Sequence, residues 1–193
     1  HGNIWRSNRG FVSLRQTKQI YYMKLGYACI NSTLQQTGGI TTNRGMRQKT
    51  FNEKGLPYVS ELALQNVKDL ETIVRWNEEM GIKLFRMSSD IFPWVTYYTL
   101  YSLPDYEEIR SILNNIGALA DEYGQRLTFH PSHFNALGSP NPTVVEKTIK
   151  ELNAHSDIMD TMNLSTTVYN KINIHIAGAY GDKQATLDRW ISN

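Results

Sequence analysis

The sequence predicts an α/β fold, a partial (β/α) barrel with parallel strands and about four of the eight strand–helix units of a full barrel. Candidate strands begin near residues 23, 83, 126 and 171, and a helical pattern follows each of them. This alternation implies parallel strands joined by right-handed crossovers. Four units are also compatible with an open sheet, but no glycine fingerprint of the dinucleotide or P-loop type follows any strand.

The four strands are predicted from short apolar or alternating runs that end at turn residues, at 23–30, 83–89, 126–131 and 171–178. The helices are predicted from apolar residues at three- and four-residue spacing, over Ser60 to Gly81, Asp105 to Tyr123, Asn141 to about Leu164, and Asp182 to Trp190. Residues 31–58 are rich in Thr, Gly, Gln and Asn and predict a long loop.

Length and composition favour one ordinary domain, since the chain has 193 residues of which 40% are hydrophobic. No apolar run approaches the roughly 20 residues of a membrane span, and the single Cys29 suits a reducing compartment, so we expect a soluble intracellular protein without a membrane partner. The chain begins at His1 and stops within a helical pattern. We therefore expect a partial sequence: a basic N-terminal extension at 1–22 and a partial barrel domain at 23–193 that lacks its C-terminal half.

Charge is distributed unevenly along the chain. Residues 1–58 carry nine Lys or Arg and one acidic residue, a net charge of +8, whereas residues 59–193 carry eleven basic and seventeen acidic residues, a net charge of −6. Basic residues interleaved with aromatic ones fit a polyanion such as DNA, because cations displace counterions from phosphates and rings stack on bases. Arg44, Arg47 and Lys49 are the candidate DNA contacts in the long loop. A solvated basic tail is the alternative interpretation.

Histidines stand near the ends of two predicted strands, His130 after the third and His175 in the fourth. In parallel α/β proteins this edge of the sheet binds ligands and metals. Neutral imidazole binds divalent transition metals, so the pair predicts part of a metal site, although three or more ligands are normally required. A hydrogen-bonded structural role is the alternative for each. Asp90 and Asp182 are candidate oxygen ligands, for which capping is the simpler interpretation.

Other residues at this edge have chemistry to offer. Tyr27 is either a core tyrosine or a residue of the site. His133 and Phe134 begin the loop after the third strand, where two rings can stack against a displaced base. Lys183 begins the last helix, where it and the backbone N–H groups can hold a phosphate, and it is the candidate catalytic residue. His155 is expected on the surface of its helix.

Four segments, in this order and spacing, resemble the UV damage endonuclease family, a group of DNA-repair enzymes. The resemblance covers about residues 23–193. The matching segments are Leu25–Asn31 (LGYACIN), Phe85–Pro93 (FRMSSDIFP), Arg126–Pro131 (RLTFHP) and Ile174–Lys183 (IHIAGAYGDK).

The resemblance implies a TIM-barrel fold and a metal-dependent endonuclease that nicks damaged double-stranded DNA 5′ to the damaged nucleotide, including ultraviolet photoproducts and abasic sites. It implies divalent metals, commonly manganese, at the C-terminal face of the barrel. By position, His130 and His175 match metal ligands, and Tyr27 matches a tyrosine beside the site. His133 and Phe134 stand where the family has a Gln-Tyr or Gln-Phe pair that probes the lesion. We expect a monomer when the protein is complete.

The sequence departs from the family pattern at three places. His133 replaces the glutamine of the probing pair. The segment Trp94–Leu100 follows Phe92-Pro93, where the family usually has a further ligand histidine. The carboxylates and histidines of the family's later strands would lie beyond Asn193. We expect such a reduced ligand set to bind metal weakly and to hydrolyse DNA slowly, if at all.

Two other functions are compatible with these patterns. Related metal-dependent TIM-barrel enzymes, the sugar isomerases and epimerases, also place histidines and carboxylates at strand ends. A sugar enzyme, however, has no use for an arginine-rich loop or a stacking pair of rings. A non-catalytic DNA-binding remnant would keep the basic segment without the chemistry.

Overall fold

The computed structural model describes residues 23–176 and 178–193. The predicted basic extension at 1–22 therefore lies outside the described residues. Three parallel strands, β1 (Gly26–Ala28), β2 (Leu84–Ser88) and β3 (Arg126–His130), form one sheet in the order β1-β2-β3. The α/β alternation expected from the sequence is confirmed for these strands.

The fourth predicted strand, 171–178, is not a strand over its described residues. One isolated bridge joins Phe129 to Ile172, residues 173–176 and 178–179 have no regular structure, and α5 (Lys183–Ser192) follows. Within the described residues this segment has β3 on one side and no further strand on the other. A single bridge to β3 is too short a ladder to make the segment a regular strand.

The predicted loop at 31–58 is wrong in part, because it contains α1 (Ser32–Gly38) and the start of α2 (Gln48–Glu79). Asn31 caps α1, since its side-chain oxygen accepts a hydrogen bond from the Leu34 N–H. Helix α2 contains a kink at Gly55, whose φ of 60° and ψ of −156° are not helical.

The sequence predicts that Ser60 begins a helix, and this prediction is wrong. Ser60 is buried inside α2, and its hydroxyl donates a hydrogen bond to the Asp105 carboxylate at 2.8 Å and accepts one from the Asp105 N–H at 2.9 Å. The bond joins α2 to the start of α3 (Tyr106–Glu122), a helix that matches its predicted limits closely. The predicted third helix is α4 (Pro142–Thr161), capped by Asn141, and the predicted last helix is α5.

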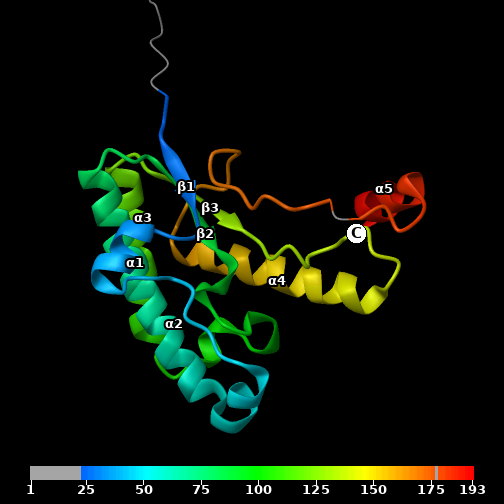
Figure 1. Ribbon diagram of the computed structural model, residues 1–193, viewed down its shortest axis with the longest axis horizontal. Helices are drawn as coiled ribbons and strands as arrows, with labels where there is room; N and C mark the ends of the chain where they lie inside the picture. The colour runs from blue at the N-terminus through cyan, green and yellow to red at the C-terminus, as the bar shows by residue number, and fades with distance from the viewer. Residues whose placement is uncertain (1–22, 177) are drawn as a thin grey trace, which may run out of the picture.

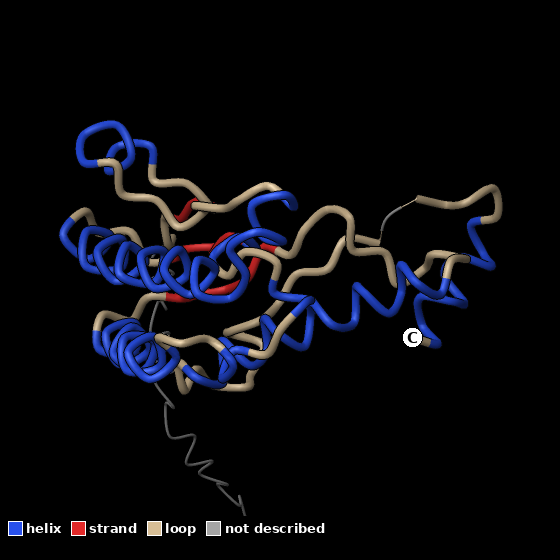
Figure 2. Tube along the Cα trace, turned by 90° about the horizontal axis from the view of Figure 1, so that it is seen from below, coloured by secondary structure: helices blue, strands red, loops and turns tan. Residues whose placement is uncertain are grey.

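The strands and helices form one layered body with an extension (Figure 1). Helices α2 and α3 pack against each other, and α4 runs across the sheet region. Between β2 and α3 the chain forms three 3₁₀ turns, η1 (Ser89–Ile91), η2 (Val95–Tyr97) and η3 (Leu100–Ser102). In Figure 2 the strands lie among the helices at one end, and the segment leading to α5 extends to the other end.

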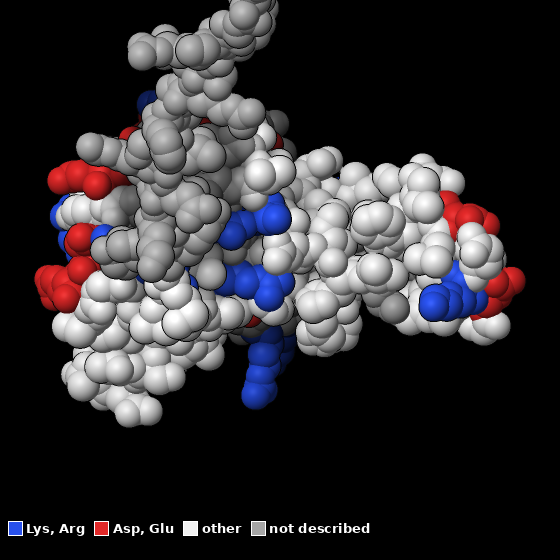
Figure 3. Space-filling view, turned by 90° about the horizontal axis from the view of Figure 1, so that it is seen from above, with Lys and Arg blue, Asp and Glu red and all other residues white. Residues whose placement is uncertain are grey.

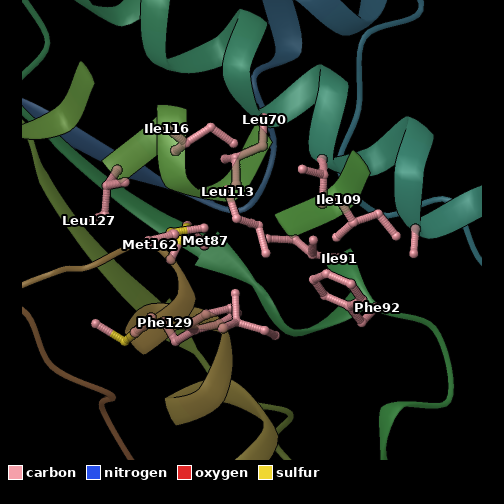
Figure 4. Close-up of a cluster of buried hydrophobic side chains, with 14 of the residues drawn as sticks. Leu70, Met87, Ile91, Phe92, Ile109, Leu113, Ile116, Leu127, Phe129 and Met162 are labelled. Carbon is pink, nitrogen blue, oxygen red and sulfur yellow. The ribbon is translucent and has the colours of Figure 1, made fainter. Parts of the chain in front are cut away.

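The hydrophobic core lies between the sheet and its helices (Figure 4). Phe85 and Met87 of β2 alternate with residues of opposite orientation, as do Leu127 and Phe129 of β3, and all four are fully buried. They meet apolar side chains of α2 and α3, which include Leu70, Ile109, Leu113 and Ile116. The other face of the sheet carries Arg86, Ser88, Thr128 and His130, so the strands have one apolar and one polar face.

His155 is buried, which corrects its expected surface position. Its exposed fraction is 0%, and its ring stacks on Phe129 with centroids 4.3 Å apart and planes at 12°. Burial lowers the pKa of His155 to about 4, and the nearby Ser89 backbone offsets this only in part. Among the described residues, no hydrogen bond of good geometry reaches either ring nitrogen. The neutral imidazole of α4 therefore packs on Phe129 of β3 as an apolar ring.

None of the helices in the described residues combines the length and apolar character needed to cross a bilayer.

Close packing of α3 on α4 predicts that Gly117→Ala destabilises the fold. A Cβ at Gly117, in the middle of α3, would overlap the carbonyl oxygen of Met162 at the end of α4. Overpacking of this kind costs about 1–3 kcal/mol, measurable as a lower melting temperature or denaturation midpoint. Gly45→Ala is the matched control, because a Cβ there meets open space; it should change stability by less than about 0.5 kcal/mol. Equal effects at the two sites would contradict the packing argument.

The buried His155 predicts a specific loss of stability in acid. The unfolded chain takes up a proton as the pH falls through the ordinary histidine pKa of 6.5, whereas folded His155 stays neutral until about pH 4. The free energy of unfolding should therefore fall between these two pH values, by about 3 kcal/mol for this group alone. Denaturant titrations at several pH values measure it. His155→Leu should flatten the dependence in that window, and His133→Leu, at an exposed histidine, should not.

Candidate active site

The structure brings His130 and His175 together. β3 ends at His130, and the bridge of Phe129 to Ile172 aligns the following segment so that His175 lies beside it. The ring centroids are 5.6 Å apart and the planes cross at 63°. With metal–nitrogen distances of about 2.0–2.1 Å, two imidazoles on one cation have centroids roughly 5–6 Å apart, so the spacing fits a shared ion.

The hydrogen bonding of His130 also suits a ligand role. Its Nδ1 lies 3.1 Å from the carbonyl oxygen of Pro131. When Nδ1 carries the proton it donates to this carbonyl, and Nε2 then keeps its lone pair for a metal. His175 is exposed, so a cation can reach it from solvent.

Two imidazoles are an incomplete ligand set. Within the described part of the chain, no group of three or more His, Cys, Asp or Glu side chains is placed to hold a metal ion. Asp182 caps α5, because its carboxylate accepts a hydrogen bond from the Ala185 N–H at 3.0 Å. Asp90 is exposed in η1, and loss of hydration, followed by the charge of Glu151, raises the pKa of its carboxyl. Neither aspartate joins the two histidines in such a group among the described residues.

His133 and Phe134 project from the loop that follows His130. Their ring centroids are 3.9 Å apart with planes at 39°, and Phe134 is 76% exposed. The pair lies in the loop after the end of β3, and both rings are exposed, so they can stack on a ligand at this edge of the sheet.

Tyr27 is tied into the fold. Its hydroxyl donates a hydrogen bond to Asn77 Oδ1 at 2.9 Å and accepts one from Asn31 Nδ2 at 2.8 Å. Burial raises the pKa of Tyr27, and the two asparagines offset part of that change. The hydroxyl thus connects β1, the cap of α1 and α2. A contact of Tyr27 with DNA stays a prediction.

The three basic residues predicted to contact DNA differ in their surroundings. Arg44 forms an ion pair with the buried Asp69 at 2.6 Å and donates to the carbonyls of Thr41 and Gly39. Its guanidinium therefore fastens residues 39–44 onto α2. Arg47 and Lys49 are exposed, and Lys49 has only a 3.8 Å contact with Glu53. Their DNA contacts stay predictions, with Arg47 and Lys49 the better placed of the three.

An aromatic cluster beside these basic residues was not predicted. Phe51 of α2 stacks on Trp94 with centroids 5.5 Å apart, and Tyr97 lies within 5.8 Å of both rings. The Trp94 indole N–H donates to the carbonyl of Met46. Trp94 and Tyr97 belong to the segment Trp94–Leu100 after Phe92-Pro93, so the segment in which the resemblance implies a ligand histidine forms part of an aromatic cluster.

Lys183 is not brought to the histidines. It is exposed at the first residue of α5, which lies far from the strands in Figure 1. The catalytic role predicted for it stays a prediction.

On the face shown in Figure 3, Lys and Arg side chains lie mostly in the middle of the molecule, and Asp and Glu side chains gather towards its two ends.

Glu151 of α4 was missed as a residue of this site. Its Oε1 accepts hydrogen bonds from the Ser132 N–H at 2.9 Å and from Asn135 Nδ2 at 2.8 Å, on either side of His133 and Phe134. A lone glutamate in an amphipathic helix carries no sequence signal for such a contact.

Comparison with known proteins shows which family the chain resembles. The sequence profile of the family described as UV-endonuclease UvdE matches residues 23–193. The chain is 38% identical over 172 residues to a protein of Acanthamoeba polyphaga mimivirus, covering 89% of this chain and 52% of that protein. It is 37% identical over 178 residues to the UV-damage endonuclease of Schizosaccharomyces pombe, covering 88% of this chain and 28% of that protein.

The fold is also similar to that of a solved structure. The crystal structure of SacUVDE superposes with a TM-score of 0.76 at 26% identity, covering 89% of this chain and 55% of that one. The chain thus spans about half of these proteins, or less, and forms the α/β partial barrel expected from its sequence. The profile match over most of the chain, together with these identities, shows that it belongs to the UV-endonuclease UvdE family.

Proposed function

We propose that this protein is a metal-dependent DNA-repair endonuclease that hydrolyses the phosphodiester bond 5′ to a damaged nucleotide. Membership of the UV-endonuclease family supports cleavage of DNA as the reaction. The observation that supports a metal is the placement of His130 and His175, with ring centroids 5.6 Å apart at the end of β3. DNA as the substrate fits an intracellular protein that acts as a monomer, in the cytoplasm or in a nucleus.

His130 and His175 would hold a divalent metal, which we expect to be manganese, through imidazole nitrogens. Such a metal supplies Lewis acidity for phosphodiester hydrolysis. The protein's own contribution at His130 is orientation, because the Pro131 carbonyl fixes the protonated nitrogen and leaves the other for the ligand bond. With two ligands among the described residues, the affinity of this part of the protein for metal should be low.

His133 and Phe134 would read the lesion. A damaged base stacks poorly and an abasic site has no base to stack, so inserting a protein ring there costs less unstacking energy than inserting it at an intact base pair. Exposed Phe134 supplies the apolar surface for that contact, and His133 lies against it. Arg47 and Lys49, which are exposed, would contact phosphates without reading the sequence.

A metal-dependent sugar isomerase gains no support from these findings, and a non-catalytic DNA-binding protein remains the alternative. Nicking assays separate the two: an irradiated duplex that the protein cuts only when manganese is present excludes the non-catalytic alternative. DNA binding without turnover under the same conditions would favour it.

The histidine pair predicts that variants of His130 and His175 lose metal affinity, whereas a variant of His133 loses preference for damaged DNA. His130→Ala and His175→Ala should each weaken manganese binding, measured by calorimetry, by at least roughly tenfold, since even the loss of an outer contact to a ligand costs 10–100-fold. Nicking should fall with it. His133→Ala is the matched control and should keep metal affinity while it weakens the preference for damaged DNA. Unchanged manganese affinity in both alanine variants would remove the assigned ligands.

Arg44 and Lys49 should give opposite results. Lys49→Ala should weaken binding to damaged and undamaged duplexes equally and lower the slope of log affinity against log salt by about 0.9, as expected for one lost phosphate contact. Arg44→Ala removes the partner of the buried Asp69 and should cost about 3 kcal/mol of folding stability. Binding titrations over a salt series and denaturant unfolding measure the two effects. A Lys49→Ala protein with an unchanged salt slope would show that Lys49 makes no phosphate contact.

A further inference from the structure

The two exposed rings stand at the tip of a β-turn. The Asn135 N–H donates to the Ser132 carbonyl at 3.1 Å, which closes a four-residue turn with His133 and Phe134 at its two central positions. The Phe134 N–H donates to Ser132 Oγ at 3.3 Å. The turn therefore follows directly from the end of β3 and presents both rings to solvent.

Glu151 holds both ends of this turn with one oxygen atom. Its Oε1 accepts the Ser132 N–H at 2.9 Å and the Asn135 Nδ2–H at 2.8 Å. One residue further on, the Ala136 N–H donates to the hydroxyl of Thr148, also on α4, at 3.0 Å. Three hydrogen bonds, from Ser132, Asn135 and Ala136, thus join the loop to one helix.

Burial changes abruptly between the tip and its base. Phe134 is 76% exposed, whereas Asn135 is 3% and Ala136 5% exposed. A segment fixed at its base and free only at two rings loses little conformational entropy when those rings insert into a partner, because the entropy was lost on folding.

The charge of Glu151 needs an explanation other than contact with DNA. A carboxylate beside phosphates is repelled by them. Its two hydrogen bonds to the turn supply that explanation, since a carboxylate oxygen accepts two N–H donors more strongly than a neutral group does.

We propose that Glu151 is the positioning residue of the His133–Phe134 turn, holding the two rings in place for insertion at a damaged site in DNA. This inference rests on the proposed function for the role of the rings, and it adds a residue of α4 that controls how well they discriminate damaged from intact duplex. In this role Glu151 acts through its hydrogen bonds to Ser132 and Asn135.

The test compares three variants of the protein. Glu151→Ala removes both acceptors. Glu151→Gln keeps an amide oxygen that can accept both bonds and removes only the charge. Glu146→Ala, on the same helix, removes an exposed carboxylate paired with Lys150 and leaves the turn untouched. Two readouts are taken: amide hydrogen exchange at Ser132 and Asn135, and binding of a duplex with an abasic analogue against an intact duplex, with thermal melts as the control for folding.

In Glu151→Ala, amide exchange at Ser132 should accelerate, because its N–H loses its acceptor. The preference for the abasic duplex should fall about tenfold, because the loosened turn must then be ordered when it binds. Glu151→Gln should restore most of both properties, and Glu146→Ala should keep them. A Glu151→Ala protein that melts normally and keeps both the protection and the preference would overturn the inference.

The remaining outcomes separate this inference from the proposed function. Loss of preference in Glu151→Gln equal to that in Glu151→Ala would also overturn the inference, because charge rather than the turn would then be responsible. A parent protein with no preference for the abasic duplex would sink the proposed function and, with it, the role given to the rings. A parent preference that survives in Glu151→Ala would sink the inference alone.

Discussion

The parallel pairing of β2 with β3 is the interaction on which the candidate site depends. Its register sets Ser88 opposite His130, so the chain leaves both strands at the same edge of the sheet. The apolar face of these strands, with Phe85, Met87 and Phe129, is buried under helices and fixes the opposite, polar face. A shift of one residue would turn His130 into the core and Phe129 out of it, which burial forbids.

Much of the polar chemistry near this edge stabilises the fold. Asn31 caps α1 and donates a hydrogen bond to Tyr27, and Asp69 of α2 pairs with Arg44 of the predicted DNA-binding loop. These side chains are buried or half-buried, and each would be costly if left without a partner. Residues that look available in the sequence are therefore already occupied, and those that remain free, such as Phe134 and Lys49, lie on the surface.

The sequence predicted the elements with the strongest periodicity and missed what depends on contacts distant in the chain. Helices α3 and α4 have clear apolar spacing and capping residues, and their limits agree closely with the prediction. α1 is one short helix in a polar segment, and the beginning of α2 is obscured by Gly55. His155 was placed outside because a histidine has no periodic signature, yet Phe129 supplies a ring for it to stack on. The proximity of His130 and His175 was predictable because His130 ends β3 and the sequence places the segment of His175 alongside that strand, where the bridge of Phe129 to Ile172 holds it. The Glu151 contacts, in contrast, require the packing of α4 on the loop.

The stacking of His155 on Phe129 connects the two parts of the candidate site. Phe129 immediately precedes His130, and His155 lies one helical turn after Glu151 on α4. The same ring contact therefore fixes β3, which carries the metal-ligand candidate, against α4, which holds the His133–Phe134 turn. The proposed metal position and the proposed lesion-reading turn then depend on the same buried contact, so its disturbance should impair both together. A neutral, unpaired imidazole suits that position, because a charged ring could not remain in the apolar layer that joins them.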